Sequence, residues 1–212
     1  MDLGKSVPGP PLCILRIVLR KTLFFIVLLW RSIALIDKYY ADTPRLRELL
    51  WIHSRQVADR CLKIAVLHPE LGLDKAFLEE AALLHDIGIL HTHAPGILCT
   101  GDAPYICHGY LGAEMLRAEG FPRHARVCER HTGAGLSREE IAAQGLPIPV
   151  QDYYPETLEE QLICYEDKFY SKSHPNGEKT PEQALKSVSK YGEDGARRFR
   201  HWMELFTENL GH

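Results

Sequence analysis

Four histidines and two aspartates are the residues of this sequence best suited to bind metal ions. They are His53, His85, Asp86, His108, His131 and Asp167. Each histidine falls on the apolar stripe of a different predicted helix, where a buried imidazole needs polar partners that apolar neighbours do not supply. One inward histidine is usually a core residue. Four of them on separate helices, together with two aspartates, indicate a shared metal site.

The adjacent pair His85–Asp86 indicates how such a site could hold two ions. Successive residues point about 100° apart on a helix, so both side chains reach one ion only where it lies beside the helix end. The two carboxylate oxygens of Asp86 could then bridge two metals about 3.5–4 Å apart. Imidazole and carboxylate ligands together favour Fe, Mn, Co, Ni or Zn over Ca or Mg.

Other polar side chains near these residues could contact a substrate. Arg130 and Lys168 each directly neighbour a predicted ligand. They could bind a phosphate group and stabilise its transfer, although a residue beside an inward one often faces solvent. His91 and His93 form an H-x-H pair in the loop after Asp86. They could bind substrate, donate a proton or simply be solvated.

The elements that would carry these residues are helices. From residue 37 onward apolar residues recur at helical spacing, and no convincing alternating strand pattern is present. Capping or helix-starting residues precede several of these stripes, at Thr43–Pro44, Asp74, Thr157 with Glu160, and Thr180–Pro181. Residues 91–104 and 145–155 are rich in glycine or proline and are expected to be loops. The sequence therefore predicts an all-α fold.

The first 36 residues form a predicted N-terminal extension that is both apolar and basic. Its unbroken apolar run, Leu23 to Trp30, is shorter than the roughly 20 residues that a membrane-spanning helix needs. Extending the run back to Leu12 includes three cations, which are costly inside a bilayer. We favour an accessory helix or an extension outside the catalytic unit. Membrane association through residues 12–36 and a signal sequence remain the alternatives.

The composition fits a single globular domain over residues 37–212. Hydrophobic residues make up 45% of the chain, and the formal net charge of −3 gives no reason to expect a nucleic-acid polymer as partner. None of the six cysteines forms a C-x-x-C pair, so a reducing cytosol fits best. Cys61, Cys128 and Cys164 lie at helical spacing among apolar residues and are expected in the core. The oligomeric state stays open.

The ordered pattern H…HD…H…H…D, with HDIG at 85–88, resembles the HD-domain superfamily of metal-dependent phosphohydrolases. His53, His85–Asp86 and Asp167 match the founding ligand set of that superfamily. His108 in HGYLGAE and His131 in ERHTGAGLS match the extra ligands of its binuclear branch. The string YEDKFYSK around Asp167 resembles the closing segment of the family. The likeness covers roughly residues 37–212 and implies an HD-domain helical bundle.

This resemblance also implies an activity. Two metals would activate a shared hydroxide for in-line attack on phosphorus, and nearby cations would absorb charge on the phosphoryl oxygens. The substrate would be a nucleotide or another small phosphorylated metabolite, hydrolysed as a monoester or a diester. Ile89 stands where the cyclic-dinucleotide phosphodiesterase branch has lysine, which argues against that branch. A mixed-valence di-iron oxygenase with the same fold and ligands is the alternative, and a regulatory module that only holds a ligand is a third possibility.

Overall fold

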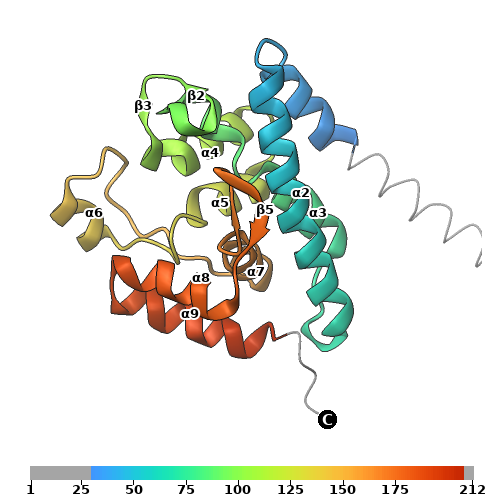
Figure 1. The fold of residues 1–212 in the computed structure, drawn as a ribbon, viewed down its shortest axis with the longest axis vertical. Helices are drawn as coiled ribbons and strands as arrows, with labels where there is room; N and C mark the ends of the chain where they lie inside the picture. The colour runs from blue at the N-terminus through green and yellow to red at the C-terminus, as the bar shows by residue number, and fades with distance from the viewer. Residues whose placement is uncertain (1–29, 208–212) are drawn as a thin grey trace, which may run out of the picture.

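The computed structural model describes residues 30–207, apart from the side chains of residues 175 and 176, and helices dominate this range (Figure 1). A helix over residues 30–39 opens the described part. The helices that follow are α2 (Pro44–Leu67), α3 (Lys75–Leu84), α4 (His108–Ala118), α5 (Pro122–Arg130), α6 (Arg138–Gln144), α7 (Leu158–Asp167), α8 (Pro181–Val188) and α9 (Glu193–Leu205). The predicted all-α fold class is confirmed.

Capping residues set the starts of several helices. Pro44 occupies the first turn of α2, as predicted. The side chain of Asp74 caps α3 by accepting a backbone N–H of its first turn, and Thr157 caps α7 by accepting the N–H of Glu160. Only this half of the predicted capping box forms, because the Glu160 carboxylate accepts the N–H of Glu156 instead.

Two small sheets and one short helix were not predicted from the sequence. The strands are β1 (Thr92–Ala94), β2 (Cys99–Thr100), β3 (Ala103–Pro104), β4 (Tyr170–Ser171) and β5 (His174–Glu178). β1 pairs with β2 and β3, within the segment expected to be a loop, and β4 pairs with β5 as an antiparallel hairpin directly after α7. β1 to β4 have only two or three residues, and β5 (HPNGE) has no apolar residue, so neither case shows a period-two pattern. The unpredicted helix is α6, which starts at a capping box on Ser137.

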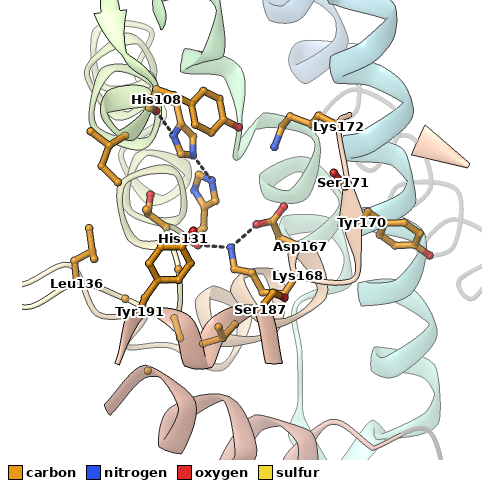
Figure 2. A pocket seen from close by; sticks show the side chains of 18 of the residues that line it. His108, His131, Leu136, Asp167, Lys168, Tyr170, Ser171, Lys172, Ser187 and Tyr191 are labelled. Atoms are coloured by element: carbon orange, nitrogen blue, oxygen red, sulfur yellow. Dashed lines mark hydrogen bonds and ion pairs between the residues drawn. The ribbon is translucent and has the colours of Figure 1, made fainter. Parts of the chain in front are cut away.

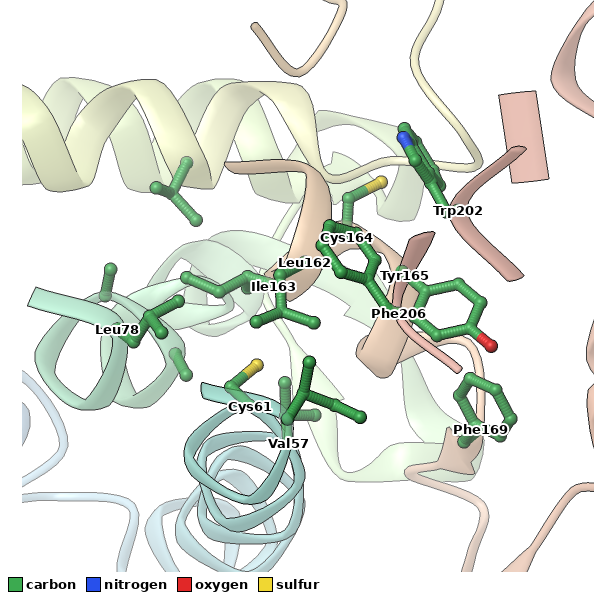
Figure 3. Close-up of a cluster of buried hydrophobic side chains, with 14 of the residues drawn as sticks. Val57, Cys61, Leu78, Leu162, Ile163, Cys164, Tyr165, Phe169, Trp202 and Phe206 are labelled. Atoms are coloured by element: carbon green, nitrogen blue, oxygen red, sulfur yellow. The ribbon is translucent and has the colours of Figure 1, made fainter. Parts of the chain in front are cut away.

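Helix α7 lies at the centre of the main hydrophobic core (Figures 1 and 3). Leu162, Ile163 and Cys164 of this helix are fully buried. Side chains of α2, α3 and α9 surround them, among them Val57, Cys61, Leu78, Trp202 and Phe206. Cys61, Cys128 and Cys164 are all buried, as expected. Because α7 is enclosed along its length, its last residue, Asp167, is held inside the protein.

A second core lies between the helix at residues 30–39 and the segment after α3. Leu35 and Ile36 are buried there together with Ile87. The Tyr40 hydroxyl donates a hydrogen bond of 2.7 Å to the Ile87 carbonyl, which ties this helix to the HDIG segment. The predicted boundary after residue 36 therefore falls inside one helix, and residues 35 and 36 contribute to the domain core.

The apolar run of the N-terminal extension lies almost entirely in residues 1–29, outside the described residues. Its role, including membrane association through residues 12–36, stays a prediction. Within residues 30–207, none of the helices combines the length and apolar character needed to cross a membrane. Trp30, the last residue of the run, is 68% exposed.

Candidate metal centre

The six predicted ligands meet at one point in the structure. His53 comes from the middle of α2, and Asp167 ends α7. His85–Asp86 directly follow α3, His108 begins α4, and His131 follows α5. Each of the six residues is buried, with between 0% and 8% of its surface exposed. The fold thus gathers polar side chains from five helices or helix ends into the interior.

A glycine contact lets two of these elements approach each other. A Cβ atom on Gly88 would lie 2.1 Å from the carbonyl oxygen of His108 and 2.3 Å from the backbone nitrogen of Gly112. Only glycine fits between the HDIG segment and the start of α4. This close backbone contact places Asp86 beside His108.

The first group of potential ligands consists of His53, His85, Asp86 and Asp167. The His53 Nε2 atom lies 2.9 Å from Asp167 Oδ1 and 3.2 Å from Asp86 Oδ2. The His85 Nε2 atom lies 3.1 Å from Asp86 Oδ2 and 3.4 Å from Asp167 Oδ1. Two imidazole nitrogens and two carboxylate oxygens therefore face a common point.

The second group consists of His108, His131 and the other oxygen of Asp86. The Asp86 Oδ1 atom lies 3.6 Å from His108 Nε2 and 3.4 Å from His131 Nε2. The two imidazole nitrogens lie 3.0 Å apart. Asp86 thus directs Oδ2 to the first group and Oδ1 to the second, the arrangement that a bridging carboxylate requires.

Backbone carbonyls fix the orientation of three of the imidazole rings. Nδ1 of His85 lies 2.6 Å from the Ala82 oxygen, and Nδ1 of His131 lies 2.6 Å from the Cys128 oxygen. The Nδ1 atom of His108 contacts the carbonyl three residues before it in the same way. Because a carbonyl can only accept, Nδ1 carries the proton in each ring. The Nε2 atoms are left to bind a cation, as is usual for metal-ligating histidines.

Burial and neighbouring charges shift the pKa values across the cluster. Burial alone would raise the pKa of Asp86, but the ammonium of Lys172 and the imidazole of His85 hold it well below its ordinary value. Burial, with the neighbouring His131, lowers the pKa of His108 to about 3. The pKa of His131 is also lowered, mainly by burial. The second group therefore presents neutral imidazoles to an ionised carboxylate.

The donor atoms of the cluster fit metal ions. The Asp86 Oδ1 atom and the His85 Nε2 atom are buried without a hydrogen-bond partner, and Asp86 Oδ2 is paired with the Lys172 ammonium. The atoms of each group lie within 4.8 Å of one another. Two donors, each about 2.1 Å from one ion and at right angles around it, would lie about 3.0 Å apart. Nitrogen and carboxylate oxygen donors suit divalent transition metals.

A cavity of about 600 Å³ opens over the cluster (Figure 2). His108, His131 and Asp167 line its inner end, together with Lys168 and Lys172. The Lys168 Nζ atom lies 2.5 Å from Asp167 Oδ2 and donates to the His131 carbonyl at 2.9 Å. Lys168 therefore lies beside the cluster, as predicted.

Lys172 was missed by the sequence analysis. Its ammonium contacts the Asp86 carboxylate, although five residues separate it from the end of α7. The hairpin of β4 and β5 carries it back over the cluster. Lys172 ends the quoted string YEDKFYSK, which is the one signal that could have drawn attention to it.

Three of the predicted substrate contacts lie elsewhere. The Arg130 guanidinium donates to the Tyr154 carbonyl at 2.7 Å and to the Glu156 carboxylate at 2.6 Å. His91 and His93 are exposed. Among the described residues, these three are not part of the cavity lining, so their roles as substrate contacts stay predictions.

Sequence comparison places this arrangement in a known family. The HD domain matches residues 50–171, a range that contains all six residues of the cluster and Lys168. The chain belongs to the HD-domain family. The resemblance read from the HDIG motif and its flanking histidines is thereby confirmed.

Three relatives match part of this chain. An uncharacterized protein of Methanocaldococcus jannaschii is 37% identical over 124 residues, which cover 54% of this chain and 66% of that protein. Two tRNA (cytidine(56)-2'-O)-methyltransferases also match. The enzyme of Picrophilus torridus is 40% identical over 99 residues, which cover 46% of this chain and 25% of that protein. The enzyme of Thermoplasma volcanium is 33% identical over 163 residues, which cover 75% of this chain and 42% of that protein. The chain thus spans less than two thirds of the length of each relative. The methyltransferase activity belongs to those whole proteins and is not assigned to this chain.

Two solved structures of the HD domain of the phosphodiesterase PgpH from L. monocytogenes are also similar. The one in complex with cyclic-di-AMP has a TM-score of 0.47 and 15% identity, and covers 84% of this chain and 100% of that chain. The other has a TM-score of 0.48 and 18% identity, and covers 84% and 89%. Both likenesses are too weak to transfer a substrate to this protein.

Proposed function

We propose that this chain is a metal-dependent phosphohydrolase that acts on a small phosphorylated substrate, such as a nucleotide. The observation that carries the proposal is the placement of Asp86. One of its oxygens faces His53, His85 and the Lys172 ammonium, and the other, which has no hydrogen-bond partner, faces the second pair of histidines. Membership of the HD-domain family supports the same chemistry.

Two metal sites follow from this placement. His53, His85, Asp86 and Asp167 would hold the first ion, and His108 and His131 would hold the second, with Asp86 shared. Bound there, divalent metal ions supply Lewis acidity, which lowers the pKa of water and neutralises phosphoryl charge. Fe, Mn, Co, Ni and Zn are the proposed candidates.

The two lysines at the inner end of the cavity would bind the phosphate. Lys168 and Lys172 are each paired with a cluster carboxylate, and both line the cavity. A phosphate group entering the cavity would therefore meet both ammonium groups beside the cluster. Fixed cations at this position stabilise charge that grows on the phosphoryl oxygens during transfer.

The rest of the cavity suits the organic part of a small substrate. Its volume lies within the roughly 300–1,000 Å³ typical of small-molecule sites. Leu136, Leu146 and Tyr191 contribute apolar surface to its outer walls. Tyr191 is 77% exposed, so its ring is available to a planar group such as a nucleobase.

A screen of phosphorylated compounds tests the proposal. The protein is loaded in turn with Mn²⁺, Co²⁺, Ni²⁺ and Fe²⁺, and phosphate release is measured over nucleotides, sugar phosphates and phosphodiesters. Turnover that disappears in Asp86→Asn supports a phosphohydrolase. Oxygen uptake by the iron-loaded protein, without release of phosphate or of a phosphomonoester, would instead establish the di-iron oxygenase alternative.

A further inference from the structure

A third lysine, Lys179, lines the same cavity but takes no part in the cluster. It follows β5, where its backbone N–H donates to the Phe169 carbonyl at 2.9 Å. Its Nζ atom donates to the carbonyl of Lys168 at 3.2 Å. Within residues 30–207, no carboxylate lies within ion-pair distance of this ammonium. Lys168 and Lys172 differ in this respect, because each pairs with an aspartate.

The surroundings of Lys179 disfavour a positive charge. Burial lowers the pKa of this lysine, Asp167 opposes the shift, and the ammonium groups of Lys168 and Lys190 add to it. A half-buried cation beside other cations costs free energy that a bound anion would offset. The cavity gives such an anion direct access to Lys179.

Lys179 contacts Lys168 at a different point from the metal cluster: its ammonium donates to the Lys168 carbonyl, whereas the Lys168 ammonium contacts Asp167 and the His131 carbonyl. Ser187 and Tyr191, from α8 and the turn η5 (Ser189–Tyr191), also line the cavity. An anion at Lys179 would therefore be separate from the phosphate at the cluster.

We propose that Lys179 forms a second phosphate site, so that the preferred substrate carries two phosphate groups, one at the metal cluster and one at Lys179. This inference rests on the proposed function, which places the first phosphate. It narrows the substrate class from phosphorylated metabolites in general to compounds with two phosphate groups. Tyr191 and the apolar wall would then face the group that joins them.

Binding of non-hydrolysable phosphonates tests the second site without requiring turnover. Isothermal titration calorimetry on the metal-loaded full chain compares alkane bisphosphonates, with one, three or five methylene groups, against the matching monophosphonates. At least one bisphosphonate should bind the wild type about tenfold more tightly than its monophosphonate, the size of a charge-assisted hydrogen bond. Lys179→Gln should abolish that advantage and leave monophosphonate affinity unchanged.

Lys186→Gln is the matched control, because Lys186 is exposed on α8 and outside the cavity lining. It should keep the full bisphosphonate advantage, and any chelation of the metals by the bisphosphonate is the same in both variants. The second site is ruled out if no bisphosphonate exceeds its monophosphonate, or if both variants lose the advantage equally. If a bisphosphonate binds about tenfold more tightly but the protein hydrolyses no phosphate compound, the second phosphate site is supported and the proposed phosphohydrolase activity is rejected.

Discussion

The Nε2 atoms of His108 and His131 lie 3.0 Å apart, and each ring donates its Nδ1 proton to a backbone carbonyl. Two nitrogen lone pairs therefore face each other at hydrogen-bond distance. A proton between them would relieve the repulsion, but the pKa of each of the two imidazoles is lowered, first by burial. A metal ion held by both nitrogens, as proposed, would relieve it instead.

Removing His131 should remove one of the two proposed ions and leave the other in place. We expect the wild type to hold two metal ions, and His131→Ala to keep the one bound by His53, His85 and Asp167 with Asp86. Phosphate release should fall by at least about a hundredfold, because charge on the transferring group loses one of its stabilising ions. The fold should persist, since Val127 and Cys128 still anchor α5 in the core. Elemental analysis beside phosphate-release rates gives both quantities.

His201→Ala is the control for this experiment, because His201 is an exposed histidine on α9 outside the cavity lining. It should keep two ions and full activity. A wild type that saturates with one ion would contradict the binuclear site. Full activity in His131→Ala would leave His108 and His131 as substrate contacts at most.

Asp86 should be the residue on which both ions depend. Asp86 is the residue that belongs to both groups of potential ligands, one oxygen to each. Asp86→Asn removes the negative charge and one acceptor oxygen, so we expect the loss of both ions and of measurable turnover. Asp102→Asn, at an exposed aspartate, makes the same chemical change outside the site and should bind metal normally. Retention of one tightly bound ion by Asp86→Asn would show that the carboxylate does not bridge.

The ligand cluster could be predicted from sequence because its residue types are rare on apolar helix stripes and occur in a fixed order. His53 and Asp167 could be paired in this way although 114 residues separate them. The positively charged residues that line the cavity could not be predicted as well from the sequence. Arg130 sits beside a ligand in the chain, yet its guanidinium is held by Glu156. Lys172 and Lys179 reach the cavity through the β4–β5 hairpin, which the sequence does not reveal because β4 has two residues and β5 has no apolar one.

Lys172 should contribute to turnover of the substrate without being needed for metal binding. Lys172→Met keeps the length of the side chain and removes the charge that contacts Asp86. We expect kcat/KM for phosphate release to fall roughly ten- to a hundredfold, because the phosphoryl oxygens lose one fixed cation. Metal content should be unchanged or higher, since a competing positive charge is gone from Asp86. Elemental analysis and steady-state kinetics, with Lys186→Met as control, separate these effects. A loss of metal would show instead that Lys172 positions the ligands.

Gly88 should be essential for folding rather than for chemistry. A methyl group there would overlap the His108 carbonyl, which belongs to the backbone and cannot rotate away. Gly88→Ala should lower the free energy of unfolding by roughly 3 kcal/mol, the upper end for overpacking in a core. Gly96→Ala is the matched control, because a Cβ at that position meets nothing within 4 Å. Urea unfolding followed by circular dichroism measures both. Equal stability in the two variants would mean that the HDIG segment can move away from α4.

Metal removal should lower the melting temperature without unfolding the protein. The cluster buries Asp86 and Asp167 among histidines whose lone pairs converge, so an ion that binds only the folded state stabilises it. At a metal concentration about a hundredfold above Kd, this linkage contributes about 2.7 kcal/mol, which corresponds to roughly 5–10 °C for a domain of this size. The contacts of Lys172 with Asp86 and of Lys168 with Asp167 supply positive charge in the absence of metal, so the chelated protein should stay folded. Thermal unfolding with and without EDTA measures the shift. Asp86→Asn should show no such shift, and an equal response of both proteins to EDTA would place the stabilising metal somewhere other than this cluster.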